Sequence, residues 1–328
     1  MSVILVVGGA GYIGSHVCKE LSRRGHLPVT YDSLITGHRH LVRWGPLEAG
    51  DLADRATLTR VLTVYRPEAV LHFAAFTSVG DSVIDPGRFY RNNVAGSLSL
   101  LEALRDHDID RVVFSSSCSV YGQPRQLPLV EDHPCIPTNP YGFTKHCVER
   151  MLADFGQAHG MRSIALRYFN AAGADPDGET GEDHLPETHL IPLALAAVAG
   201  RGPPLTILGT DYATPDGSCI RDYVHVTDLA VAHVQALEAL DRLSKREVSH
   251  AFNLGAGEGY SVLQVLAMVE KVTGRMVPVV VGPRRPGDEP LLVGDCGRAL
   301  RELGWQPRFS SLETIVETAW RWLKESRF

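Results

Sequence analysis

The sequence lacks several features that would assign a protein to a class at once. Its six cysteines form no CxxC pair, which argues against a zinc knuckle or a disulfide framework, so we expect reduced thiols. No apolar run approaches the ~20 residues that a membrane-spanning helix needs. A formal net charge of -6 leaves no basic surplus for a nucleic-acid backbone or an anionic membrane, so we expect neither as a partner.

Metal-ligand spacing and a secretion signal are also missing. The 14 histidines form no HExxH motif, and His38 and His40 in a loop are more typical of solvated residues, so we expect no metal. The first apolar run, Val3–Val7, has no basic start and stops at glycines. We therefore expect a buried strand there and a cytoplasmic protein.

Apolar strands alternate with amphipathic helices over the first half of the chain. This pattern is typical of a parallel sheet covered on both faces, so we predict a doubly wound α/β (Rossmann) fold. The expected strands are Val3–Val7, Pro28–Tyr31, Ala69–Ala74, Arg111–Ser115 and Ser163–Tyr168, and the expected helices are Ile13–Arg24, Ala56–Tyr65, Phe89–Leu104 and Tyr141–His159.

A change of composition after Asn170 predicts a second, smaller mixed α/β lobe. The segments GADPDGETGEDHLPE and GRGPP are rich in Gly, Pro and acidic residues and interrupt the alternation. We assign residues 1–169 to a dinucleotide-binding domain and 170–328 to a substrate lobe, and we expect 224–255 to return to the first sheet.

A glycine motif predicts the cofactor. Gly8, Gly11 and Gly14 stand between a strand and a helix, where bare backbone lets a pyrophosphate approach the helix N-terminus. Asp32 follows 18 residues after Gly14 at the end of the next strand, where a carboxylate accepts hydrogen bonds from ribose hydroxyls. A 2′-phosphate would meet this charge, so the sequence favours NAD. Asp51 and Leu52 follow a third short strand where such folds hold the adenine, although a turn aspartate is an alternative.

A tyrosine and a lysine one helical turn apart indicate the chemistry. Tyr141 and Lys145 project from the same helix face, and a neighbouring cation favours the phenolate that a base needs. Upstream, a strand ends in Ser115-Ser116-Ser117, where a hydroxyl could orient a substrate alcohol or merely cap a turn. The order of glycine motif, serine strand end and TyrxxxLys is typical of a short-chain dehydrogenase, so we predict hydride transfer.

Longer motifs cover nearly the whole chain: GGAGYIGSH, YDSL, GDL, HFAAFTSVGDSV, RNNVAGSLSLLEAL, FSSSCSVYG, NPYGFTK, RYFNAAGADPDG, DGSCIRDYVHVTDLA, FNLGAGEGYSV and RRPGDEP. Together they resemble the UDP-glucose 4-epimerases, which are extended short-chain dehydrogenases/reductases. The resemblance implies an isomerase of galactose metabolism with tightly bound NAD, a UDP-sugar substrate and a homodimer built from helices Phe89–Leu104 and Tyr141–His159.

The resemblance also implies roles for individual residues. Tyr141 would be the base, Lys145 its pKa-lowering partner, and Ser117 the relay at the sugar 4-hydroxyl. The implied cofactor contacts are Gly8, Gly11, Tyr12, Ile13, Gly14, Asp32, Ser33, Asp51, Leu52, Phe73, Ala74, Ala75, Asn92, Ser115, Tyr141, Lys145 and Tyr168. The implied substrate contacts are Thr77, Ser117, Tyr141, Asn170, His189, Leu190, Leu208, Arg221, Tyr223, Arg285, Asp288 and Leu292.

Three residues depart from the family pattern. Thr77 stands where some members have a lysine near the nicotinamide, and Leu208 where some have an aromatic ring near the uracil. Leu292 occupies the position where a large tyrosine excludes N-acetylated sugars and a smaller residue admits them. The range of accepted sugars is therefore left open.

Other functions share part of this pattern. A 4,6-dehydratase needs an acid pair after the serine strand end, but Cys118 and Ser119 stand there, which disfavours dehydration. A 4-epimerase of UDP-glucuronate, UDP-xylose or an N-acetylhexosamine would keep the same catalytic residues. A non-catalytic NAD-binding sensor is disfavoured because the Tyr-Lys pair is present.

Overall fold

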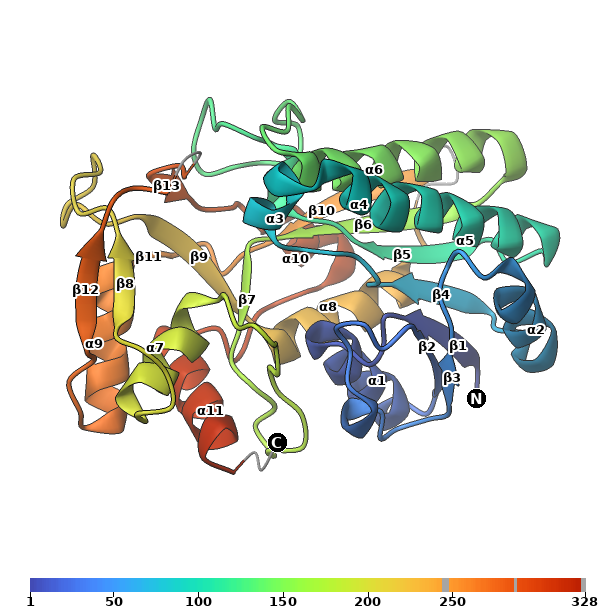
Figure 1. The fold of residues 1–328 in the computed structure, drawn as a ribbon. Coiled ribbons are helices and arrows are strands. Elements are labelled where there is room, and N and C mark those ends of the chain that lie inside the picture. Colours follow the sequence, from blue (N-terminus) through green and yellow to red (C-terminus); the bar gives the residue numbers. More distant parts are fainter. Residues whose placement is uncertain (244–247, 286–287, 326–328) are drawn as a thin grey trace.

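A central parallel sheet organises the computed structural model, which describes residues 1–243, 248–285 and 288–325 (Figure 1). Its seven strands run in the order β10-β6-β5-β4-β1-β2-β3, and all their pairings are parallel. The strands are β1 (Val3–Val7), β2 (Leu27–Asp32), β3 (Leu47–Ala49), β4 (Ala69–His72), β5 (Arg111–Ser115), β6 (Arg162–Tyr168) and β10 (Ser249–Leu254).

Two helical layers cover this sheet because its strands carry apolar side chains on both faces. Ile4 and Val6 of β1 face a core shared with one layer, while Leu5 and Val7 face a core shared with the other. The first layer holds α1 (Tyr12–Arg23), α8 (Val226–Ala239) and α10 (Gly297–Leu303); the second holds α2 (Arg55–Tyr65), α5 (Gly96–Asp106) and α6 (Pro140–His159). The predicted doubly wound fold is confirmed.

A smaller mixed α/β lobe lies beside the carboxyl ends of the central strands (Figure 1). Its largest sheet is built around β9, which pairs with β7, β11 and β13. The lobe's elements are β7 (Asn170–Ala172), α7 (Leu190–Val198), β8 (Leu205–Leu208), β9 (Ile220–His225), β11 (Gly259–Ser261), α9 (Val262–Thr273), β12 (Val279–Gly282), β13 (Leu291–Leu292) and α11 (Leu312–Glu325). A third apolar core joins α7, α9 and α11.

The chain crosses between the lobes more than once. It leaves the large sheet after β6, forms β7, α7, β8 and β9, and then returns through α8 and the edge strand β10. The Pro286-Gly287 pair of the RRPGDEP motif and residues 326–328 lie outside the described residues. Among the helices that the structure describes, none is long and apolar enough to cross a bilayer.

The expected helix Phe89–Leu104 is present, since the backbone is helical without a break from Pro86 to Asp106, but it contains a π-helical turn that the prediction did not include. The segment is α4 (Pro86–Phe89), a π-helical turn at Tyr90–Ala95 and then α5, and it follows the short helix α3 (Val79–Ile84). Within the π turn, Asn93 bonds outside its own helix to the backbone of Phe76 and to Thr144. Such turns often mark functional sites.

Candidate functional site

The turn between β1 and α1 is shaped for close approach by a ligand. Gly8 has φ +85°, and a Cβ there would lie 2.6 Å from the Ala74 nitrogen. A Cβ on Gly14 would lie 2.2 Å from the Gly8 oxygen. The N-cap of α1 is Gly11, which offers no side-chain cap to the first-turn N–H groups. These amides fit the pyrophosphate of a dinucleotide.

Asp32 stands fixed at the end of the neighbouring strand. Its two carboxylate oxygens accept hydrogen bonds from the backbone amides of Ala10 (3.0 Å) and Leu34 (2.8 Å). Burial raises the pKa of this carboxyl, while the two amides oppose that shift. Each oxygen keeps acceptor capacity for a ribose hydroxyl, so the residues present fit NAD.

The other predicted cofactor residues gather along one edge of the sheet. The carboxyl ends of parallel strands meet at the same edge, and each central strand except β10 contributes there. The contributions are Gly8 to Gly14 with Tyr12 and Ile13 after β1, Ser33 after β2, Asp51 and Leu52 after β3, Phe73 to Ala75 after β4, Ser115 on β5 and Tyr168 on β6. Asn92 lies in the π turn, beside the buried Asn93.

The start of α6 places Tyr141 and Lys145 at this edge. Asn139 caps the helix by accepting a hydrogen bond from the Gly142 amide (2.9 Å). One turn separates the two side chains, and both are buried. The Lys145 ammonium donates to the Ser115 carbonyl at 2.7 Å and lies 5.9 Å from the centre of the Tyr141 ring.

The protein environment shifts the pKa of both side chains. Burial raises the pKa of Tyr141 to about 12, while a hydrogen bond with the Ser117 side chain acts in the opposite direction. Burial lowers the pKa of Lys145 to about 7, against the influence of Glu149. Ser117 is thus the neighbour that favours the phenolate here. The expected contribution of Lys145 stays a prediction.

The small lobe contributes a cluster of two arginines and one aspartate near the start of α6. Asp288 accepts a hydrogen bond from Arg221 (3.3 Å) and two from Arg285 (2.6 and 3.1 Å). Arg221 on β9 lies opposite Leu292 of β13. Burial raises the pKa of Cys118, next to Ser117, to about 12, and the charge of Arg221 opposes that shift. Leu292 also packs in the apolar cluster around Tyr121, which includes Cys118. The arginine therefore lies close to Ser117 and Cys118, after the end of β5.

The remaining predicted substrate residues are distributed over both lobes. Asn170 of β7 pairs with Tyr223 of β9 and donates to the Asp222 carbonyl at 3.0 Å. Thr77 is exposed after β4, and Leu208 is exposed at the end of β8. His189 caps α7, which begins at Leu190, and contacts two glutamates.

Sequence reasoning missed several residues that hold the site together. Buried Asp222 accepts backbone hydrogen bonds from Ala256 (2.7 Å), Gly257 (3.3 Å) and Gly294 (3.2 Å), and burial raises its pKa to about 6. Asn93 ties the loop after β4 to α6. Each lies inside a quoted motif, but no local pattern shows which polar side chain in a motif turns inward.

A buried ion pair beneath the serines was also missed. Glu149 of α6 binds Arg167 of β6 at 2.6 and 2.9 Å and accepts a hydrogen bond from Ser116 at 2.5 Å. This pair fixes the helix that carries Tyr141 to the strands beside it.

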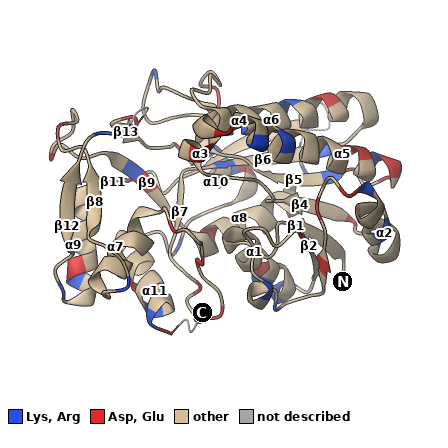
Figure 2. Ribbon diagram, in the orientation of Figure 1, with Lys and Arg blue, Asp and Glu red and all other residues tan. Residues whose placement is uncertain are grey.

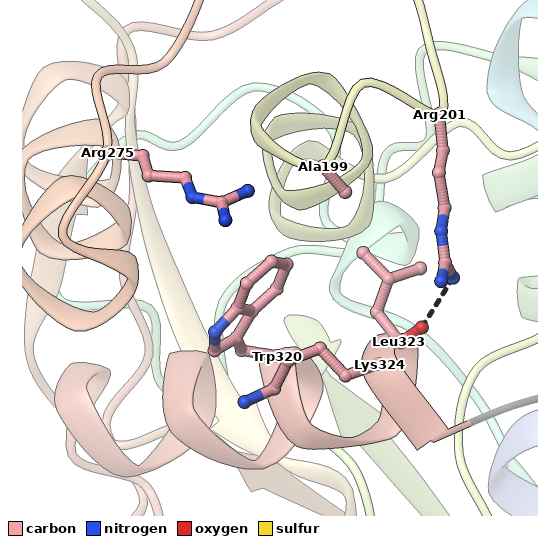
Figure 3. Close-up of a pocket in the computed structure, with 6 residues that line it drawn as sticks. All are labelled: Ala199, Arg201, Arg275, Trp320, Leu323 and Lys324. Atoms are coloured by element: carbon pink, nitrogen blue, oxygen red, sulfur yellow. Dashed lines mark hydrogen bonds between the residues drawn. The ribbon is translucent and has the colours of Figure 1, made fainter.

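A separate pocket of about 210 Å³ lies in the small lobe, away from these residues (Figure 3). Trp320 and Leu323 of α11 form one wall, and Arg201 donates a hydrogen bond to the Leu323 carbonyl. No predicted site residue lines it. Figure 2 shows acidic and basic residues interspersed over both lobes.

Comparison with known proteins identifies similar chains. Residues 4–255 match the NAD dependent epimerase/dehydratase family. A UDP-glucose 4-epimerase of Rhizobium leguminosarum bv. trifolii is 51% identical over 323 residues, which cover 98% of both chains. The crystal structure of the Brucella ovis UDP-glucose 4-epimerase in complex with NAD is 51% identical, with a TM-score of 0.94 and 98% coverage of both chains. The Bifidobacterium longum enzyme, in complex with NAD+ and UDP, is 35% identical with a TM-score of 0.93, covering 99% of this chain and 98% of that one.

Proposed function

Because this chain belongs to the NAD dependent epimerase/dehydratase family, we propose that it interconverts UDP-glucose and UDP-galactose by inverting C4 of the hexose. It is an NAD-dependent epimerase. Tyr141 on α6 and Ser117 after β5 converge with Arg221 from the small lobe. This convergence supports the activity most directly, because the reaction needs a base at one hydroxyl and an anchor for the nucleotide.

In the proposed mechanism, side chains of the protein move the proton of the 4-hydroxyl and hold the nucleotide sugar in place. Tyr141 removes the proton of the sugar 4-hydroxyl, directly or through Ser117, and later returns it to the same oxygen. NAD, which the glycine turn and Asp32 would hold, would supply an oxidised ring able to take up hydride from C4 and to return it. The reaction thus ends without net oxidation.

Inversion requires the 4-keto sugar to turn over without leaving. Arg221 and Arg285 would hold the diphosphate, since guanidinium forks match its oxygens, while Asp288 would meet the uridine ribose. Asp288 pairs with both arginines, which keeps all three side chains in one place. Anchoring at this distance leaves the hexose free to rotate.

We assign the cofactor to residues 1–169 with 224–255 and the nucleotide sugar to residues 170–328. We also propose a homodimer that packs α5 and α6 of two copies, and a cytoplasmic location. All six cysteines are free, which agrees with the reducing conditions of the proposed cytoplasmic location.

The test is a product assay without added hydride acceptor. The purified protein would be incubated separately with UDP-galactose, UDP-glucose, UDP-N-acetylglucosamine and UDP-glucuronate, and the products separated by chromatography. We expect the first two to be converted into each other. If NAD is bound and neither sugar reacts, the proposed substrate is wrong. Conversion of the N-acetyl sugar as well would indicate that Leu292 leaves a roomy pocket.

A further inference from the structure

The chain between β7 and α7 contacts both lobes, and we call residues 173–189 the interlobe strap (Figure 1). On the large-lobe side, the Tyr12 hydroxyl donates to the Gly173 carbonyl at 2.5 Å, and His38 contacts the Asp183 carbonyl at 2.8 Å. On the small-lobe side, Trp322 of α11 donates to the Glu182 carbonyl at 2.8 Å. The strap is thus fixed from both sides.

Four metal-ligating side chains converge at the end of this strap. The Nδ1 atom of His189 lies 2.7 Å from Glu182 Oε1 and 3.0 Å from Glu187 Oε1. The Nδ1 atom of His184 lies 3.1 Å from Glu182 Oε1 and 3.7 Å from Glu187 Oε2. One ligand atom from each of the four residues lies within 4.8 Å of every other.

This geometry suits one cation better than two separate ion pairs. A single Nδ1–H can point at one acceptor, yet each of the two nitrogens faces oxygens of both carboxylates. The corners of a tetrahedral Zn²⁺ site with ligands at ~2.0–2.1 Å are about 3.3 Å apart. The separations that involve Glu182 Oε1 or Glu187 Oε2 are 2.7, 3.1 and 3.7 Å, which scatter around that value. Two imidazoles favour zinc over the oxygen-seeking Mg²⁺ and Ca²⁺.

We propose that Glu182, His184, Glu187 and His189 bind one Zn²⁺ ion. Surrounding groups already orient these ligands, as they do around protein metal sites. Glu187 Oε1 accepts the backbone amides of Thr188 (2.6 Å) and His189 (2.8 Å), which leaves Oε2 for the ion. The ring of His184 packs edge-on against Tyr12, and the side chain of Glu182 is 6% exposed.

The ion fixes the strap between α1 of the large lobe and α7 of the small lobe. Tyr12 is the first residue of α1, at the dinucleotide turn, and His189 is the cap of α7. Zinc at this place is structural, because its four positions are filled by side chains. With His189 as a ligand, the substrate contact that the resemblance implies for this side chain is not available. This inference concerns the strap alone and stands whichever sugar the enzyme uses.

Metal content and a cobalt spectrum test the site directly. The protein would be purified without chelator after growth with zinc, and zinc counted by mass spectrometry. We expect roughly one ion per chain. Chelation should lower Tm, and zinc should restore it by about 5 °C. Replacement by Co²⁺ should give the intense visible bands of a four-coordinate ion with nitrogen and oxygen ligands.

A double variant and a matched control locate the ion. H184A/H189A should lose the zinc and the cobalt bands. H38A/H40A removes two histidines that face the adjacent Asp183, at 3.8 and 3.3 Å, and should keep both signals. Should H184A/H189A fail to fold, E187Q gives a milder test, with zinc affinity lower by at least tenfold. Wild-type protein that binds neither ion, or loss of the ion only in H38A/H40A, would overturn the assignment.

Discussion

The phenol of Tyr141 carries the proton in the proposed reaction, so its removal should affect the chemical step. Tyr141→Phe should lower kcat by about 10²–10⁴-fold, the usual contribution of a positioned acid-base group. Binding of NAD should be retained, because the glycine turn and Asp32 are untouched. Steady-state kinetics with UDP-galactose measures the effect, and Tyr65→Phe on α2 is the control. Unchanged kcat in Tyr141→Phe would remove this residue from the mechanism.

The side chain at position 292 should set the size of the sugar pocket. Leu292 lies across from Arg221 and packs with the cluster that contains Cys118. An aromatic ring in place of this leucine would therefore narrow the space beside Cys118. Leu292→Tyr should lower kcat/KM for UDP-N-acetylglucosamine by about tenfold or more relative to UDP-glucose. Competition assays with both sugars measure the ratio. An unchanged ratio would place the N-acetyl group elsewhere.

At the scale of elements, α5 and α6 carry exposed apolar side chains that the proposed homodimer would bury. Leu98 of α5 is 39% exposed and Phe143 of α6 is 45% exposed, and the Phe143 ring lies 6.3 Å from that of Tyr90. Leu98→Glu should convert the proposed homodimer into a 35.8 kDa monomer, because a buried unpaired carboxylate opposes association. Sedimentation measures the mass.

An exposed leucine on the opposite helical layer provides the control for this variant. Leu300 of α10 is 50% exposed, and Leu300→Glu should leave the dimer intact. A wild-type protein that sediments as a monomer would contradict the proposed dimer, whereas equal dissociation of both variants would place the interface elsewhere.

At the scale of the whole molecule, buried histidines should make the fold sensitive to acid. Burial lowers the pKa of four of them: to about 4 for His16 and His233, and to about 3 for His72 and His225. A histidine in the unfolded chain titrates near 6.5, so below this pH the unfolded state binds more protons and stability falls. The loss continues until the pH reaches the folded pKa.

Urea denaturation at pH 7.5, 6.5 and 5.0 measures this dependence. Each such histidine should remove about 2 kcal/mol from the free energy of unfolding between pH 6.5 and 5.0. His233→Leu should show a shallower decline than the wild type, although its stability at pH 7.5 is also expected to change. A free energy of unfolding that does not vary over this range would contradict neutral burial of these side chains.

Local pattern alone was enough to predict the first sheet and the position of several candidate site residues at its edge. Strands with apolar residues on both faces, a glycine turn after β1, and a carboxylate at the end of β2 are set by short-range chemistry, and the structure has each of them. The meeting of these ends at one edge also follows, because parallel strands expose their carboxyl ends together. The sequence by itself therefore determined the fold class, the cofactor and the Tyr141–Lys145 pair.

Only the tertiary structure decided which polar residues meet across long distances in sequence. Asp222 accepts hydrogen bonds from the amides of Ala256 and Gly294, and Arg221 approaches the loop after β5. Asn93, rather than Asn92, connects the π turn to α6. The contacts of Asp222 and Arg221 depend on how β9 pairs with β7, β11 and β13, a choice among distant partners that no local period encodes. The four ligands of the strap are neighbours in sequence, yet their convergence depends on the backbone path fixed by Tyr12 and Trp322.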